Sequence, residues 1–448
     1  MAPLQAARLS GVRSGRLPPS HGCLLRCVSA PLLPRRPRGS KGFVRTRATT
    51  PSSAIARVAS SKRAASGGKV GAALTLTEPQ VAEVPSLREL RQAIPKDCFE
   101  PDTRESLKYA AVDLAWMFGC FAASPFVAEH PILTLPYAAV TGLAMWSVFV
   151  VGHDCGHGSF SKSNVLNGVV GHICHAPLMV PFYPWAYSHK QHHRFHNHRT
   201  KDMSHPWMKA EEYKETNAVV RALALDHWIG LYLGFPGYLL MEPEWSSTDG
   251  SHFWPWSRLF DRAPKDERLK CAVSSASCIA FLAGTFAFAG GPVNWAIEYG
   301  APYLVFSWWL FTVTYLQHHD HDTETFEEGE WEYVLGGAET IDREFGLGID
   351  KVTHNITDCH VAHHMFTDMP HYKLERATKA VRGVLEPRGL YKRRDTRDFV
   401  RKVFTLHEEN GHCIDASADG GRPRATRAEL EALLPNNNRV LTSDEKRQ

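Results

Sequence analysis

The sequence VGHDCGH, residues Val151–His157, ends a long apolar block with two histidines, and the interpretation of the whole chain starts from it. Two further histidine clusters follow, HKQHH at residues 189–193 and HVAHH at residues 360–364. Histidines three or four residues apart project from one face of a helix, so each cluster can direct two or three imidazoles at one point. The clusters offer eight nitrogen ligands, a reasonable set for two metal ions: His153, His157, His189, His192, His193, His360, His363 and His364.

Four apolar blocks reach, or nearly reach, the length of a membrane span: Tyr109–Val127, Pro131–Gly152, Ala272–Ala289 and Ala301–Leu316. A helix rises 1.5 Å per residue, so about 20 residues cross a hydrocarbon core of about 30 Å. Proline, glycine and histidine interrupt two other apolar stretches, Leu166–Trp185 and Trp228–Met241, which we expect to be re-entrant or interfacial. We therefore predict an all-α, polytopic membrane protein with about four transmembrane helices.

The order of these blocks places the histidines on one side of the membrane. No full span separates the first cluster from the second, and two spans separate the second from the third. A fourth group, QHHDHD at residues 317–322, follows the last span, and His318 is favoured as a further ligand because it continues the helix from Thr314.

Asp113, inside the first block, either has a partner within the bundle or shows that this span starts later. Five carboxylates are candidate acceptors for the imidazole N–H groups: Asp154, Asp202, Asp320, Asp322 and Asp358.

The residue types narrow the chemistry. Neutral imidazole binds zinc, copper and iron, but the HExxH motif of zinc hydrolases is absent, as are the repeated Glu-x-x-His pairs of soluble di-iron bundles. The 10 cysteines form no CxxC pair. A membrane-surface cap holding a dinuclear iron centre that activates O2 fits these clusters better. His196 and His198 are weaker candidates for ligands, and we expect structural roles for the lone histidines His172, His175, His205, His227, His252, His354 and His371.

Charge divides the chain into segments. Residues 1–77 hold eleven arginines, three lysines and no acidic residue, so they carry +14 while the whole chain carries +4, which leaves −10 for the rest. This composition is typical of a transit peptide for a plastid or mitochondrion, with a basic tail that binds anionic lipid as the alternative. The acidic remainder argues against nucleic acid as a partner. An amphipathic segment (78–108), the membrane domain (109–386) and a polar C-terminal tail (387–448) are expected to follow.

The three clusters, in this order and between paired apolar blocks, resemble those of the integral-membrane fatty acid desaturases over roughly Ser86 to Glu386. The stretch VVGHDCGHGSFSKSNVLNGVVGH is similar to the plastid omega-3 desaturases, whereas HNITDCHVAHHMFTDMPHYKLERATKAV is more similar to the delta-12 (omega-6) branch. The second cluster, HKQHHRFHNHR, departs from the omega-3 pattern HRTHHQNHGH. The resemblance therefore indicates a methyl-end desaturase of plastid-like type and leaves the double-bond position open.

This resemblance implies that the eight histidines, with His318 as a ninth, hold two irons. It implies an O2-dependent enzyme that introduces a cis double bond into the acyl chain of a membrane lipid, within a dry tunnel between the spans and with water as co-product. The electron donor would be ferredoxin in a plastid membrane or cytochrome b5 at the endoplasmic reticulum, since the HPGG motif of a fused cytochrome b5 module is absent. The alternatives are a di-iron acyl or carotenoid hydroxylase or ketolase and a non-catalytic membrane protein that transports or senses a metal.

Overall fold

The computed structural model describes residues 83–205, 208–209, 227–241, 250–410 and 414–415. Three parts of the chain for which the sequence makes predictions lie outside these described residues: the transit segment, the side chain of His227 and the tail beyond residue 415. Two short parallel strand pairs accompany the helices, β1 (Met208–Lys209) with β4 (Ile414–Asp415) and β2 (Asp342–Glu344) with β3 (Arg393–Asp395). The α-helices are α2 (Leu87–Ala93), α3 (Thr103–Glu129), α4 (Thr134–His157), α5 (Asn164–His175), α6 (Phe182–Phe195), α9 (His227–Met241), α10 (Glu267–Ala289), α11 (Pro292–Trp295), α12 (Ala301–His318), α13 (Tyr333–Ala338), α14 (Ile349–Val352), α15 (His360–Met365), α16 (Leu374–Leu385) and α17 (Phe399–Asn410).

Three helical stretches of the described chain are long and apolar enough to cross a membrane: Thr103–Glu129, Pro131–His157 and Glu267–Ala289. The helical pair Asn164–Leu178 and Phe182–Phe195 is bent by 98° and adds a fourth if it is counted as one span. This bend lies in the stretch that the sequence predicts to be re-entrant. Helix α12 contains the block Ala301–Leu316, which the sequence predicts as a span, but it is not one of the three stretches. A π-helical turn joins it to α11. The predicted all-α, polytopic fold with about four spans is confirmed.

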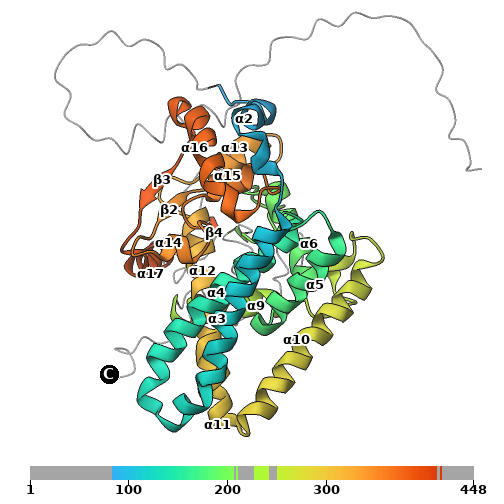
Figure 1. The fold of residues 1–448 in the computed structure, drawn as a ribbon. Helices are drawn as coiled ribbons and strands as arrows, with labels where there is room; N and C mark the ends of the chain where they lie inside the picture. The colour runs from blue at the N-terminus through green and yellow to red at the C-terminus, as the bar shows by residue number, and fades with distance from the viewer. Residues whose placement is uncertain (1–82, 206–207, 210–226, 242–249, 411–413, 416–448) are drawn as a thin grey trace, which may run out of the picture. The chain divides into compact units, whose positions relative to one another are not determined.

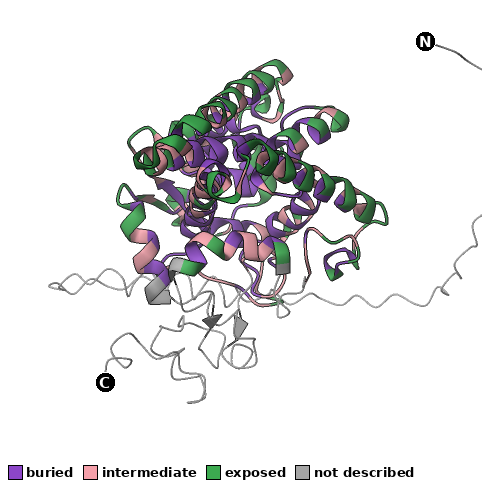
Figure 2. Ribbon diagram, turned by 90° about the horizontal axis from the view of Figure 1, so that it is seen from below, coloured by how far each residue is buried: buried purple, intermediate pink, exposed green. Residues whose placement is uncertain are grey.

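Helix α4 is the centre of the bundle, and it packs against α3, α5 and α12 (Figure 1). Gly142 allows α4 and α12 to come close, because a Cβ at this position would lie 2.6 Å from the side chain of Val305. The outward side chains of α3 and α10 are apolar and exposed, as Phe126 and Phe288 are, which suits contact with lipid. Figure 2 shows buried residues in the interior and exposed residues along the outer helices.

The last part of the described chain, which the sequence assigns to a polar tail, packs against the rest. Strand β3 pairs with β2, and α17 packs against α9 and α12. A second apolar cluster joins α2, α13, α15 and α16, with Leu90, Val361 and Val381 fully buried in it. In Figure 1 these four helices lie together at the end of the bundle where α4 and α12 finish. They form a cap that carries the third histidine cluster.

Of the two alternatives that the sequence leaves open for Asp113, the structure shows a buried partner. Its carboxylate lies 2.5 Å from Nε2 of His354, and both residues are buried. His354 belongs to the segment between α14 and α15, so this contact joins that segment to α3. The ring of Tyr109, one turn before Asp113, packs edge-on against His354 at a centroid distance of 5.3 Å.

Candidate metal centre

The first histidine cluster occupies the last two turns of α4. His153 and His157 lie one turn apart, and their Nε2 atoms are separated by 3.2 Å. The helix ends directly after them because Gly158 adopts a left-handed φ of 79° and its amide caps carbonyl groups of the last turn. Gly152 allows α5 to approach, since a Cβ there would lie 2.2 Å from the ring of His175. The end of α4 therefore presents two imidazoles directly beside the α5–α6 pair.

Five imidazoles from α4, α6 and α15 converge in one group. On α6, the Nε2 atoms of His189 and His193 are 3.1 Å apart. Nε2 of His363 on α15 lies 3.1 Å from Nε2 of His193. The bend between α5 and α6 turns this histidine face toward α4. All five ligand atoms lie within 4.8 Å of one another in the group of His153, His157, His189, His193 and His363.

A second group lies beside the first. The ligand atoms of His192, His318 and His364 lie within 4.8 Å of one another. His360 adjoins them, with its Nε2 3.1 Å from Nε2 of His318 and its ring centroid 4.3 Å from that of His364. The HH pairs of the second and third clusters are divided between the two groups, because successive residues on a helix point about 100° apart. The structure thus brings together all nine residues that the sequence predicts as ligands.

The two groups can be tested as metal sites by their geometry and donor atoms. Two imidazole nitrogens bound at right angles to one ion, each at about 2.1 Å, lie about 3 Å apart, close to the Nε2 separations of 3.1–3.2 Å. Within the described residues, neither group contains a thiolate or carboxylate. Buried ring nitrogens in the groups lack hydrogen-bond partners, among them Nδ1 of His360 and Nε2 of His364. This all-imidazole donor set fits two iron ions as well as zinc or copper.

The protonation of the third cluster also favours metal binding. Burial, followed by the neighbouring imidazoles, lowers the pKa values of His360, His363 and His364 well below the usual value for histidine. Neutral imidazole is the form that binds a metal, whereas imidazolium has no free lone pair. The third cluster is therefore ready to act as a ligand set at neutral pH.

Asp202 orients the second cluster from outside. Its Oδ1 accepts hydrogen bonds from Nδ1 of His192 at 2.7 Å and from the amide of His205 at 3.0 Å. Burial alone would raise the pKa of Asp202, but His192 and the hydrogen-bond donors around the carboxylate lower that pKa to about 2. A carboxylate on Nδ1 leaves Nε2 of His192 free to face the second group, as in many metal sites. The prediction for Asp202 is confirmed.

Asp154 connects the first cluster to the cap. Its Oδ2 accepts hydrogen bonds from the amide and Nδ1 of His371, at 2.9 and 2.8 Å, and its Oδ1 lies 3.6 Å from Nδ1 of His153. The prediction that a carboxylate accepts from an imidazole is therefore confirmed for Asp154, but it is wrong for the three remaining carboxylates. Asp320, Asp322 and Asp358 instead contact Arg343, Arg394 and Asn355, respectively.

Three histidines outside the predicted set contribute to the surroundings of the two groups. His371 holds Asp154, and Nδ1 of His196 lies 3.4 Å from Nδ1 of His364. The ring of His205 stacks on that of His318 at a centroid distance of 4.5 Å. His198 lies elsewhere, against Glu328. The repeated pattern HRFHNH is a weak signal for His196, whereas isolated histidines such as His205 and His371 carry no signal in the sequence.

Apolar helices bring together nine histidines from four segments beneath a helical cap. This arrangement defines a polytopic membrane protein of the class that carries spaced histidine motifs, known as histidine boxes. Residues 130–396 match the family described as fatty acid desaturase. The chain belongs to the fatty acid desaturase family. The prediction of an enzyme that desaturates fatty acyl chains is thereby confirmed.

Three relatives illustrate the range of the family. The chain is 40% identical over 322 residues to the Delta(12) fatty acid desaturase fat-2 of Caenorhabditis elegans, covering 69% of this chain and 81% of the relative. It is 38% identical to an sn-2 acyl-lipid omega-3 desaturase (ferredoxin), chloroplastic, of Helianthus annuus, over 67% of this chain and 66% of the relative. It is also 38% identical to an acyl-lipid omega-3 desaturase (cytochrome b5), endoplasmic reticulum, of Arabidopsis thaliana, over 66% of this chain and 76% of the relative.

Proposed function

We propose that this enzyme uses O2 to introduce a cis double bond at the omega-3 or delta-12 position of an acyl chain in a membrane glycerolipid. The reaction converts –CH2–CH2– to –CH=CH– and consumes one O2, two electrons and two protons to form two waters. The observation that carries the proposal is the convergence of two adjacent imidazole groups at the end of apolar helices. The names of the relatives support both the reaction and the two positions.

The nine histidines would hold two irons, His153, His157, His189, His193 and His363 in one group and His192, His318, His360 and His364 in the other. Bound irons would supply the O2 activation that removal of hydrogen from an unactivated methylene requires. The chain itself supplies rigid positions for the imidazoles, through Asp202 and Asp154, and an environment from which water is excluded.

Aromatic side chains form the apolar side of this centre. The ring of Trp185 stacks on His189 at a centroid distance of 4.5 Å, and Phe149 packs edge-on against Trp185 at 5.1 Å. Phe306 and Phe235 extend this apolar cluster into the bundle. A hydrocarbon chain would approach the histidines from this side, because its methylene groups contact these rings there and are removed from water.

Lipid analysis tests the proposed reaction directly. We expect that a host lacking its own omega-3 and delta-12 desaturases, when it expresses the full chain, accumulates fatty acids with one additional cis double bond. Gas chromatography and mass spectrometry of the methyl esters, with the empty vector as control, report the position of that bond and, after separation of lipid classes, the carrier. A new hydroxy acid without any new diene or triene would instead assign the chain to the hydroxylases.

The amino-terminal segment supports a proposal for the cellular location and the electron donor. We propose a plastid membrane and ferredoxin, with the endoplasmic reticulum and cytochrome b5 as the alternative. The charge of residues 1–77 supports this choice, since acidic residues are absent from that segment and Arg, Ser and Ala are frequent. One relative is named as chloroplastic with ferredoxin and another as endoplasmic reticulum with cytochrome b5, so both pairings occur in the family.

A fusion of residues 1–77 to a fluorescent protein should enter plastids of a plant or algal cell. The physical reason is that import receptors read the basic, acid-free composition of such a segment. Confocal microscopy against chlorophyll fluorescence measures the outcome. In the matched control, all eleven arginines of the segment are replaced by glutamine, and the reporter should stay in the cytosol. Import of the original fusion into mitochondria would contradict the plastid assignment and leave the proposed reaction unaffected.

A further inference from the structure

Two neighbouring residues of β2, Asp342 and Arg343, contact the ends of the two helices that present His318 and His360. Both are buried, with 0% and 1% of their surfaces exposed. They belong to none of the histidine clusters and lie on a three-residue strand that the apolar pattern does not indicate. Their contacts with α12 and α15 nevertheless lead directly to the second group of imidazoles.

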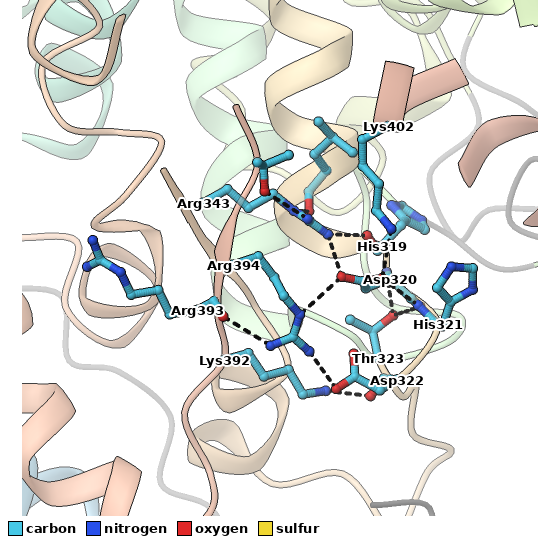
Figure 3. Close-up of polar contacts among 12 residues, drawn as sticks. His319, Asp320, His321, Asp322, Thr323, Arg343, Lys392, Arg393, Arg394 and Lys402 are labelled. Atoms are coloured by element: carbon cyan, nitrogen blue, oxygen red, sulfur yellow. Dashed lines mark hydrogen bonds and ion pairs between the residues drawn. The ribbon is translucent and has the colours of Figure 1, made fainter. Parts of the chain in front are cut away.

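Arg343 holds the end of α12. The last carbonyl groups of a helix have no partners within it, and His318 is the final residue of this one. Arg343 donates hydrogen bonds to the carbonyl oxygens of Leu316 and His319, at 2.5 and 3.1 Å, and forms an ion pair with Asp320 at 2.8 Å (Figure 3). These acceptors flank His318 on both sides. A planar guanidinium can satisfy all of them at once, which a single ammonium group cannot do in the same geometry.

Asp342 holds the start of α15. Its Oδ1 accepts a hydrogen bond of 2.8 Å from the amide of Val361, the residue directly after His360. The N-cap of α15 makes no side-chain hydrogen bond of its own, so this carboxylate from another segment takes the place of a cap. Its other oxygen accepts from the hydroxyl of Tyr391, which keeps the carboxylate in one orientation.

The strand itself is held from both sides. The amide of Asp342 donates to the carbonyl of Lys392 at 3.0 Å, and the amide of Arg343 donates to the carbonyl of Thr357 at 2.9 Å. Successive side chains on a strand point in opposite directions, so one reaches α15 while the next reaches α12. The Nε2 atoms of His318 and His360 on these two helices are 3.1 Å apart.

We propose that Asp342 and Arg343 are positioning residues that together set the distance between His318 and His360 in the second imidazole group. The inference rests on the proposed function, in which both histidines bind the same metal ion. Loss of either contact would free one helix end and move one imidazole away from the other. The first group would change less, because α4 and α6 supply four of its five members and only His363 comes from α15.

The test uses the full chain, purified in detergent and stripped of metal, with Co²⁺ as the probe. Wild-type protein should bind two Co²⁺ per chain, each with a visible absorption band. In the Arg343→Lys variant, one of the two sites should lose about 10-fold to 100-fold in affinity, the effect typical of residues that support metal ligands. The band of that site should shift as its ligand geometry changes, while the site of the first imidazole group stays as in the wild type.

Two further variants separate positioning from a general loss of structure. Asp342→Asn keeps an oxygen acceptor for the amide of Val361, so it should weaken the same site less than Asp342→Leu does. Glu344→Gln is the matched control on the same strand, because Glu344 is half exposed and pairs at 3.0 Å with an exposed side chain, that of Arg393. This control should bind both ions as the wild type does.

The possible results distinguish the two proposals. If Arg343→Lys and Asp342→Leu both bind two Co²⁺ with unchanged affinity and spectra, the positioning role is wrong while the proposed ligand set stands. If wild-type protein binds no Co²⁺, the proposed metal centre is wrong and the positioning role fails with it. If Arg343→Lys does not fold, a graded loss at one site from Asp342→Asn to Asp342→Leu supports the proposal, and equal, undisturbed binding in both refutes it.

Discussion

The His363→Ala variant should produce less than about 1% of the wild-type amount of desaturated fatty acid. His363 is the member of the five-histidine group that comes from the cap, and its Nε2 lies 3.1 Å from that of His193. Loss of a residue that merely supports a metal ligand typically costs 10-fold to 100-fold, so loss of a ligand should cost about 100-fold or more. Fatty acid profiling of the expressing host measures the activity.

Iron analysis of the same purified variant gives a second readout. We expect the iron content to fall from about two ions per chain toward one, because the second group, with His364, retains its members. The control is His172→Gln, since His172 lies outside both groups and its ring bonds to the carbonyl of Gly168 and the hydroxyl of Ser274. Glutamine can replace these hydrogen bonds, so iron content and product should remain near wild type. Full activity in His363→Ala would refute its role as a ligand.

The largest loss of stability should come from His354→Ala. This change leaves the buried carboxylate of Asp113 without the partner that lies 2.5 Å away, within an apolar span. Removing one member of a buried pair costs about 3 to 5 kcal/mol, because the remaining polar group loses its partner and cannot reach water. The free energy of unfolding, measured by titration with denaturing detergent, should fall by about 3 kcal/mol.

A double variant shows whether the uncompensated carboxylate is the cause. Asp113→Leu combined with His354→Ala removes both partners and should be more stable than His354→Ala alone, since no polar group is then left unpaired. As a surface control, Lys162→Ala breaks an exposed ion pair with Glu100 and should change stability by less than about 1 kcal/mol. A double variant that is no more stable than His354→Ala would show that the unpaired carboxylate of Asp113 is not the cause of the loss.

Much of the centre could be predicted because its signals are local. Spacings such as His189-x-x-His192-His193 are readable in the sequence, and a helix turns them into a common face. The length of the apolar blocks predicts how often the chain crosses the bilayer and so on which side each cluster lies. His318 could be favoured because it lies one turn beyond Thr314 at the end of the last block.

The supporting contacts could not be predicted in the same way. The sequence offered five carboxylates near the clusters, and only the folded chain distinguishes Asp154 and Asp202, which face histidines, from Asp320, which pairs with Arg343. The partner of Asp113 lies 241 positions away, so no local pattern points to it. The division of the histidines into groups of five and four depends equally on how α4, α6, α12 and α15 meet.

The class of this protein could be predicted from apolar lengths and histidine spacings, because these are short-range properties that the bilayer and the helix convert into structure. The folded chain was needed to see which imidazoles share a group, which carboxylates orient them and how Asp342 and Arg343 connect two helix ends. The reason is physical. Hydrogen bonds between buried groups depend on distances of a few tenths of an ångström across segments far apart in the chain, and packing of the whole bundle sets those distances.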